Sequence, residues 1–496
     1  MSAPSTPLIA ALDIGTSSVR AMLFDARGRP VPGAQASVAT PLVTTAEGGA
    51  EVDPDGLVRA AVAALAAVEA QAGGRAAQVV AVAVCTFWHS LLGVGRGGSP
   101  LTPIYTWADA RAAGVVPRLR RQFDERAVHA RTGARFHGSY WPAKLAWLRQ
   151  SQPRTFGRVE RWMSPGEYLF LRLFGTPLCS ISMASGTGLF DQNRLDWDGE
   201  LLAALDVDRA QLSPLADLDA PASGVGEPFR SALPRLARVP WLPALGDGAC
   251  NSVGSGCMGR GRVALMVGTS GAMRLLFAAR EARAPWGLWC YRADARRYLV
   301  GGAISNGGNL YAWMVDTLRL AKNPELEAAL AALEPDGHGL TVLPFLAGER
   351  SPGYLPGATA TISGLRWHTR PVEILRAGLE AVAYRLALIY ELLRPLASPE
   401  AQIIASGAAL VQSPVWTQII ADVLGRPVTI TATPEATSRG AALLAAEALG
   451  LLPDPALVPV ELGPAFEPDP ARHERYLAGL ARHRRLYRKL LGRGAF

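Results

Sequence analysis

The chain has 496 residues, of which 49% are apolar and 19% are charged. A chain of this length exceeds one ordinary hydrophobic core, so we expect two domains, and the composition excludes a disordered protein. The net charge of +8 does not predict a nucleic-acid partner, because only three of the 50 basic residues are lysines, and an arginine-rich, alanine-rich chain is typical of a genome-wide coding bias.

The cysteines and the apolar runs indicate a cytoplasmic protein. The five cysteines are an odd, scattered set without a Cys-x-x-Cys pair, which argues against a disulfide framework or a structural zinc site. The first residues carry no basic segment, and no uninterrupted apolar run reaches about 18 residues, so we expect no membrane partner. The one dense basic run, ARHRRLYRKLLGRG at 481–494, is interpreted as a solvated helix, and no DNA-binding module accompanies it.

The first predicted element is a hairpin of two buried strands, LIAALDIGTSSVRAMLFD. An ordinary hairpin tip is a dipeptide such as Asn-Gly, whereas this tip carries Gly15, Thr16, Ser17 and Ser18. Tight turns of this composition present backbone N–H groups and hydroxyls to an anion, which is how phosphates are held. Asp13 directly precedes the turn and is placed for a magnesium ion shared with the phosphates.

Alternating helices and strands follow the hairpin. Residues 53–74 have an Asp-Pro start, apolar helical spacing and a glycine stop, and the next segment, AAQVVAVAVCTF, is typical of a buried strand. Residues 213–243, rich in proline, alanine and leucine, are interpreted as the approach to a second domain that begins near residue 245.

The second half of the chain repeats the opening hairpin. VALMVGTSGAMRLLF at 263–277 has the same order of strand, Gly-Thr-Ser turn and strand, and the two turns are 253 residues apart. A repeat of this period predicts two related domains, each opening with the same device. A third glycine turn, Ser406-Gly407-Ala408-Ala409, follows the predicted strand QIIAS. Neither a Walker A motif nor a GxGxxG fingerprint is present.

An aspartate lies just upstream of the second turn, in ALGDGACNSVGSG. Asp247, between Gly246 and Gly248, is interpretable either as a helix cap or as a catalytic acid, and the local sequence leaves both readings open.

Six motifs in a fixed order carry a resemblance to a known family: DIGTSSVRAMLFD (13–25), WADAR (107–111), GDGAC (246–250), VGTSGAMR (267–274), GERSPG (348–353) and ASGAALVQSPVWTQIIADVLGRPV (405–428). Nearly end to end, the chain resembles the FGGY-type carbohydrate kinases, of the superfamily that includes actin, hexokinase and Hsp70. The resemblance implies an α/β fold of two RNase H-like (actin-like ATPase) domains, each a mixed five-stranded sheet flanked by helices, with a cleft between them. It places the N-terminal, sugar-binding domain at 1–244, the C-terminal, nucleotide-binding domain at 245–455 and a helical tail at 456–496.

The resemblance also assigns roles. Asp13 matches the metal-linked acid, and Asp247 matches the general base that accepts the proton of the sugar hydroxyl. The implied nucleotide contacts are Gly15, Thr16, Ser17, Gly268, Thr269, Gly407 and Ala408, and the implied sugar contacts are Trp88, His89, Asp109, Arg111 and Asp247. The implied cofactors are ATP and Mg²⁺, and the partner is a small-molecule sugar or sugar acid, with a homodimer left open. Ala408 replaces a glycine of the family's adenosine turn, which bears on nucleotide preference.

The sequences of three motifs indicate which substrate group within the family the chain resembles. TWADAR, SNGGNLYAW and LPFLAGERSPG look most like the gluconate-kinase branch, with xylulose and ribulose kinases next and a non-phosphorylating, sugar-sensing ATPase of the same fold as a further alternative. A glycerol kinase is less favoured, because residues 87–111 lack the arginine-glutamate pair of that group. The carboxylate of gluconate would need a cation, for which Arg111, Lys144 and His89 are the candidates.

Overall fold

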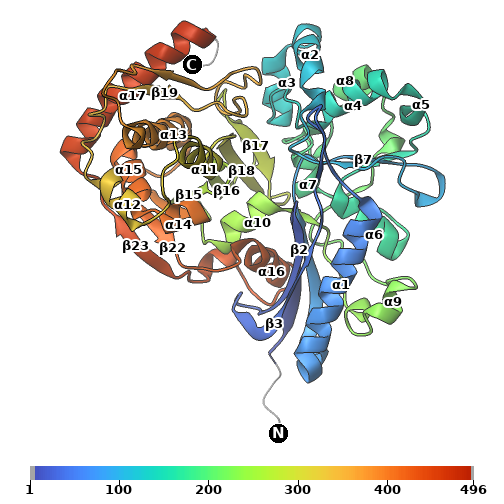
Figure 1. Cartoon of the computed structure of the whole chain (residues 1–496). Coiled ribbons are helices and arrows are strands. Elements are labelled where there is room, and N and C mark those ends of the chain that lie inside the picture. Colours follow the sequence, from blue (N-terminus) through green and yellow to red (C-terminus); the bar gives the residue numbers. More distant parts are fainter. Residues whose placement is uncertain (1–5, 493–496) are drawn as a thin grey trace.

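The computed structural model describes residues 6–492 and shows two α/β domains side by side (Figure 1). The sheet of the first domain has the order β14-β6-β1-β2-β3, in which β1 runs parallel to β6 and antiparallel to β2. Its strands are β1 (Leu8–Ile14), β2 (Ser18–Asp25), β3 (Pro30–Ala39), β6 (Val79–Thr86) and β14 (Leu245–Gly246).

The sheet of the second domain repeats this plan and extends it. Its order is β17-β18-β16-β15-β21-β22-β23, and the five central strands have the same pairing directions as the first sheet. The repeat is therefore confirmed, but the second sheet has seven strands where five were expected, because β17 and β23 add an antiparallel strand at each edge. The strands are β15 (Arg262–Val267), β16 (Gly271–Ala278), β17 (Trp289–Arg292), β18 (Arg297–Ile304), β21 (Gln402–Ser406), β22 (Val428–Thr431) and β23 (Leu462–Phe466).

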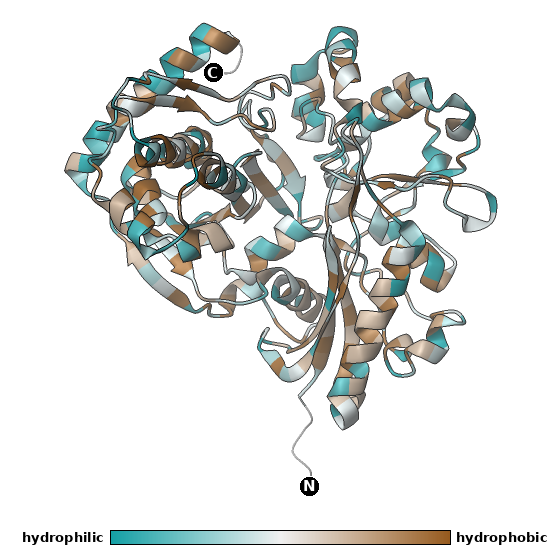
Figure 2. Ribbon diagram, in the orientation of Figure 1, coloured by the Kyte–Doolittle hydropathy of each residue, from teal (hydrophilic) through white to brown (hydrophobic). Residues whose placement is uncertain are grey.

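Helix α1 (Pro54–Ala72) covers β2 and β3 of the first sheet, as its apolar spacing predicted. The Asp53 carboxylate caps it by accepting hydrogen bonds from the N–H groups of Asp55 and Gly56. Among the described residues, Pro54–Gln78 is the one helical segment long and apolar enough to cross a membrane, but half of its apolar window is buried inside the domain. Figure 2 shows many brown, hydrophobic residues along this helix, and apolar residues such as Leu57, Leu65 and Val68 are buried, which is the pattern of a core helix.

Two helices join the domains. Helix α10 (Asp247–Gly254) packs against α16 (Ala436–Ala448), and residues 441–446 of α16 belong to the apolar core of the first domain. A Cβ on Gly254 would lie 1.7 Å from the Ala436 carbonyl oxygen, and one on Gly440 would lie 1.8 Å from the Cys250 carbonyl oxygen. Strand β14 and helices α10 and α16, which follow the boundary expected at residue 244, therefore pack on the sheet and the apolar core of the first domain.

The tail contributes both a strand and a helix. Strand β23 closes one edge of the second sheet, so the expected helical tail is partly extended chain. Helix α17 (Pro470–Leu491) lies on α15 (Pro414–Leu424) and on β19 (Thr341–Leu343). Within the described part of the basic run, Arg482 pairs with Asp336 and Arg484 pairs with Glu391, so acids of this same chain take up these two arginines.

The remaining described helices complete the two domains. They are α2 (Val116–Gln122), α3 (Glu125–Thr132), α4 (Trp141–Ser151), α5 (Pro153–Phe156), α6 (Pro165–Phe174), α7 (Ile181–Ser185), α8 (Gly199–Leu205), α9 (Phe229–Ala232), α11 (Gly308–Thr317), α12 (Pro324–Ala331), α13 (Pro371–Leu393) and α14 (Ala408–Gln412).

Substituting Gly440→Ala tests the joint between the domains. We expect a loss of about 3 kcal/mol or more in the free energy of unfolding, because the new methyl group meets backbone and forces the two helices apart. Urea unfolding followed by circular dichroism measures the change. The matched control is Gly199→Ala in α8, where the added methyl meets nothing within 4 Å, and we expect a change of less than about 1 kcal/mol there. Equal effects of the two substitutions would contradict the close helix contact.

Candidate active site

Two adjoining cavities lie where the domains meet. The first has a volume of about 250 Å³, and the second, of about 310 Å³, shares the lining residues Trp107, His137, Ser139, Ser270 and Arg350 with it. The first cavity is also bordered by Thr16, Phe87, Trp88, His89, Tyr140, Asp247, Gly248, Met266, Gly271, Ala272, Arg274, Trp289, Tyr291, Ala303 and Tyr354. Both domains and the joint between them contribute to this lining.

The first polar turn connects β1 to β2. The Gly15 N–H donates to the Ser18 carbonyl oxygen at 2.9 Å, which closes the turn, and the Thr16 hydroxyl borders the first cavity. The indole N–H of Trp107 donates to Thr16 Oγ1 at 3.1 Å, so the WADAR segment is tied to this turn. Ser17 borders neither cavity.

The carboxylate of Asp13 is almost fully buried beneath the first turn. Arg20 Nη2 donates to its Oδ2 at 2.7 Å, and the Cys85 thiol lies 3.6 Å from its Oδ1. Burial raises the pKa of Asp13, and the neighbouring Arg20 guanidinium opposes that rise. Asp13 itself borders neither cavity, whereas Thr16 of the turn that follows it borders the first.

The second and third turns lie against each other in the second domain. The Gly268 N–H donates to the Ser270 carbonyl oxygen at 2.9 Å, and the Gly308 N–H at the start of α11 donates to the Gly268 carbonyl oxygen at 2.7 Å. Thr269 borders the second cavity, and Ser270 borders both. Because Gly407 has φ of 101° and a Cβ there would lie 2.3 Å from the Val267 carbonyl oxygen, only glycine fits at this turn.

Ala408 begins α14 and does not have a positive φ, so its backbone does not need the glycine that the family carries there. Gly407 and Ala408 border neither of the two cavities.

Asp247 is the first residue of α10 and borders the first cavity. The cap residue of this helix is Gly246 and no side chain caps it, so the helix-cap reading of Asp247 is wrong. Burial raises the pKa of Asp247 to about 6, the nearby Arg274 charge opposes the rise, and the Asp13 charge adds to it. Among the described residues, the one hydrogen bond to its side chain comes from the Gly248 N–H to Oδ1, at 2.7 Å, which leaves the other carboxylate oxygen for a ligand.

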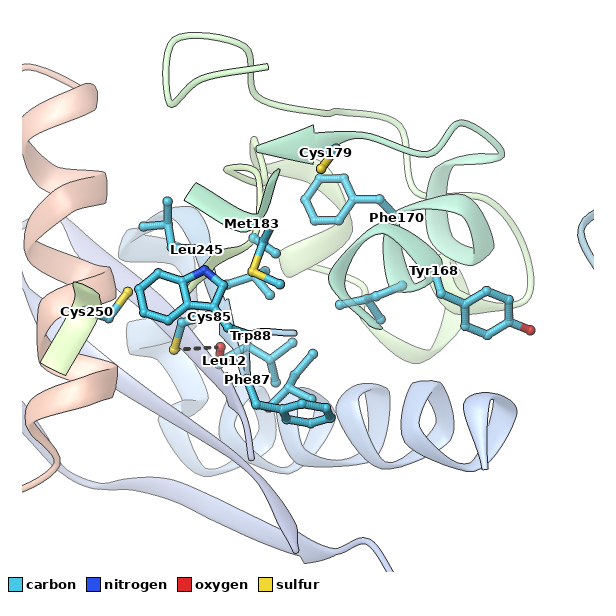
Figure 3. Close-up of a cluster of buried hydrophobic side chains, with 14 of the residues drawn as sticks. Leu12, Cys85, Phe87, Trp88, Tyr168, Phe170, Cys179, Met183, Leu245 and Cys250 are labelled. Carbon is cyan, nitrogen blue, oxygen red and sulfur yellow. Dashed lines mark hydrogen bonds between the residues drawn. The ribbon is translucent and has the colours of Figure 1, made fainter. Parts of the chain in front are cut away.

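The glycines beside Asp247 have a packing reason. The indole of Trp88 lies against both, so that a Cβ on Gly246 would fall 1.9 Å from the ring and one on Gly248 would fall 2.8 Å from it. Figure 3 shows the Trp88 ring next to Leu245 and Cys250, with the Cys85 thiol directed at the Leu12 carbonyl oxygen. Trp88 therefore sets the depth at which Asp247 enters the cavity.

Aromatic side chains form an uncharged part of the wall of the first cavity. The Tyr140 and Tyr291 hydroxyls share a hydrogen bond, and the Trp289 and Tyr291 rings stack at a centroid distance of 4.3 Å. His89 has φ of 67°, and its Nδ1 lies 2.5 Å from the Gly186 carbonyl oxygen. Burial lowers the pKa of His89 to about 3, so this imidazole is neutral near pH 7 and is not the cation that a carboxylate would need.

Arg111 and Lys144 also fail as carboxylate ligands. The Arg111 guanidinium pairs with Asp109 and Glu51 and lies over the Trp147 ring, and it borders neither cavity, although Asp109 borders the second. Lys144 Nζ donates to the carbonyl oxygens of His89, Tyr105 and Thr106 at 2.7, 3.2 and 2.8 Å. Burial lowers the pKa of Lys144 to about 7, and this side chain also borders neither cavity.

Two arginines that the sequence analysis did not assign do reach the first cavity. Arg274 lies on β16 and Arg350 lies in the GERSPG loop, and neither has an ion pair among the described residues. A usable signal was present for one of them, because Arg274 is a lone charge in the otherwise apolar strand GAMRLLFA.

Taken together, paired glycine-hydroxyl turns, a buried acid and an aromatic cavity between two repeated domains form the site of a phosphotransferase that acts on a small polyhydroxy compound. The chain belongs to the FGGY family of carbohydrate kinases, whose N-terminal domain model matches residues 8–254 and whose C-terminal domain model matches residues 263–449.

The chain is similar to kinases that are named for different substrates. Gluconokinase of Bacillus subtilis is 27% identical over 90% of this chain and 88% of its own length, and glycerol kinase of Methylobacterium nodulans is 30% identical over 91% of each. Among solved structures, a gluconate kinase from Lactobacillus acidophilus superimposes with a TM-score of 0.90 at 27% identity, covering 99% of both chains. A xylulose kinase from the same organism reaches 0.91 at 27% identity, over 98% of this chain and 99% of its own.

Substituting Lys144→Met tests how the sugar side of the cavity is held. We expect a loss of about 3 kcal/mol in the free energy of unfolding, because three buried carbonyl oxygens lose their donor. We also expect KM for the sugar to rise about tenfold, since the His89 and Thr106 backbones shift against the cavity. Lys489→Met, on the exposed side of α17, is the matched control. An unchanged KM together with the lost stability would limit Lys144 to a role in folding.

Proposed function

We propose that this carbohydrate kinase transfers the γ-phosphoryl group of MgATP to a hydroxyl of gluconate. The observation that carries the proposal is the position of Asp247, whose carboxylate enters the same cavity as Thr16 of the first turn and Ser270 of the second. The choice of gluconate is supported by the gluconate kinases among the relatives and by the two cavity arginines without ion pairs. A pentulose such as xylulose is the alternative substrate.

The chemistry follows from this arrangement. Phosphoryl transfer passes through a loose transition state, so the attacking hydroxyl needs orientation more than a strong base. With a pKa of about 6, Asp247 is a carboxylate near pH 7, and its free oxygen accepts the hydrogen bond of the reacting hydroxyl and then its proton. The N–H groups and hydroxyls of the two turns hold the phosphates in line and stabilise their charge.

The residues present fit a magnesium ion. Mg²⁺ prefers oxygen ligands and keeps several waters, so a single protein carboxylate together with nucleotide phosphates is sufficient to hold it. Asp13 would be that carboxylate, because its Oδ1 has only a weak thiol contact. When bound, Mg²⁺ neutralises charge on the transferred phosphoryl group.

The same cavity favours the sugar over water as the acceptor. Trp88, Trp289 and Tyr291 occupy its walls, and the two domains meet around it. A sugar that fills this space displaces water from the neighbourhood of the γ-phosphoryl group, which suppresses hydrolysis of ATP. We propose a cytoplasmic setting, in keeping with five free, buried cysteines.

Asp247→Asn tests the base. We expect kcat to fall by about 100-fold or more while the Kd for ATP stays unchanged, because the amide keeps the shape but cannot accept the proton. Initial rates and calorimetric titration with ATP measure the two quantities. Near-full turnover in Asp247→Asn would contradict the assignment.

The pH dependence provides a separate check. Because the pKa of Asp247 is raised to about 6, its carboxylate becomes protonated as the pH falls through that value, and kcat/KM of the wild type falls with it. Below this point we expect a drop of about tenfold per pH unit. An acid limb near pH 4 would instead indicate an unperturbed carboxyl group.

A substrate panel tests the choice of sugar. ATP consumption is measured with gluconate, xylulose, ribulose and glycerol, with Asp247→Asn as the blank for each. We expect the highest kcat/KM with gluconate. A higher value for a pentulose or glycerol would replace gluconate as the substrate, and stimulation by none of them would favour the sugar-sensing ATPase.

A further inference from the structure

Arg274 is a cation in the wall of the first cavity that has no contact ion pair among the described residues, although the charge of Asp247 acts on it without touching it. Its guanidinium makes no hydrogen bond or ion pair with any described residue, and its Nη1 is buried without a hydrogen-bond partner. A guanidinium removed from water without an anion is costly, and replacing such a charge by an apolar side chain is often neutral or stabilising. An arginine kept under these conditions indicates an anionic ligand that supplies the missing partner.

The strand register places Arg274 on the sugar side of the site. Gly271, next to the second turn, pairs with Ile304, whereas Arg274 pairs with Gly301, three residues deeper along both strands. At about 3.3 Å per residue, this separates the two backbone positions by about 10 Å. Arg274 also borders only the first cavity and not the second, which contains Thr269 of the phosphate turn.

Arg350 occupies the other level. Its Nη2 donates to the Ile304 carbonyl oxygen at 3.3 Å, beside the end of β18 where the second turn pairs, and it borders both cavities. The two arginines therefore lie at different levels of the strands, Arg350 at Ile304 and Arg274 at Gly301, and the Nε of Arg274 comes within 3.4 Å of a Cβ built on Gly248, the residue after Asp247.

The surroundings of Arg274 fit a sugar acid. Gly301, its pairing partner, has no side chain, so the Trp289 ring lies across this position and borders the same cavity. The other described cations considered for a carboxylate are excluded, since Arg111 is ion-paired and Lys144 is held by carbonyl oxygens.

We propose that Arg274 is the carboxylate anchor of the sugar acid, and that it determines the selectivity of the enzyme for acids over neutral sugars. The proposal rests on the proposed function. A planar guanidinium binds a carboxylate through two parallel hydrogen bonds, which a lysine ammonium cannot reproduce. The carboxylate end of the substrate lies against β16, and the reacting hydroxyl lies toward Asp247 and the two turns.

The test compares gluconate with gluconamide, its neutral amide. We expect the wild type to prefer gluconate by about 100-fold in kcat/KM. In Arg274→Met this preference disappears through a rise in KM for gluconate that gluconamide does not share. Arg274→Lys recovers part of the preference, because it restores the positive charge but cannot form the two parallel hydrogen bonds of a guanidinium.

Two further variants and a folding readout complete the design. Arg350→Met lowers the rates with both substrates alike, and Arg59→Met, on the exposed face of α1, changes neither. The thermal midpoint of Arg274→Met stays close to that of the wild type, because the side chain is only partly buried and the variant breaks no contact ion pair among the described residues.

Each outcome decides the proposal. Equal losses for gluconate and gluconamide in Arg274→Met would overturn the anchor, assign Arg274 to Asp247 or the phosphates, and leave the proposed function intact. A selective loss for gluconate in Arg350→Met alone would also overturn it. If the wild type does not phosphorylate gluconate, the proposed function fails. In that case, calorimetry with gluconate tests the anchor separately. Binding of gluconate to the wild type that is lost in Arg274→Met would support the anchor. Absence of gluconate binding to the wild type would overturn it.

Discussion

The backbone contact between α10 and α16 is the constraint on which the rest of the molecule depends. Because Gly254 and Gly440 have no Cβ, the backbones of the two helices can lie in direct contact. Arg439 of α16 donates to the Gly254 and Gly28 carbonyl oxygens at the same contact. Because α10 begins with Asp247, this contact determines where the acid stands between the domains. Helix α16, from the second half of the chain, thereby completes the apolar core of the first domain.

A second constraint concerns the charged side chains that line the partly buried first cavity. The sugar-side cavity contains one carboxylate, two guanidiniums and a wall of aromatic rings, and its two histidines are neutral near pH 7 because burial lowers the pKa of each to about 3. The Asp247 carboxylate and the Arg274 guanidinium influence each other without touching. The cavity therefore holds a carboxylate and two guanidiniums that make no contact ion pair among the described residues.

Much of the fold could be predicted because it is written in local patterns. The apolar strands around Gly15 and Gly268, the capped helix after Asp53 and the repeat of the hairpin all depend on neighbouring residues, and all are present. The extent of the first domain could not be read in this way. Strand β14 and helix α16 belong to it through contacts with residues far away in the sequence, so no composition shift marks the boundary.

For the site, the sequence indicated which types of residue are present, and the folded structure decided which partners they have. The sequence by itself determined the two turns, the acid before each, and the glycines around Asp247, since these depend on turn chemistry and on backbone approach. Only the tertiary structure decided which cations are available. Three residues carry suitable nitrogen atoms, but Arg111 and Lys144 have protein partners and His89 is neutral. Arg274, in contrast, borders the cavity without a hydrogen bond or contact ion pair among the described residues. The free energy of a charge depends on what surrounds it, and those surroundings come from three strands and a helix that meet only in the folded chain.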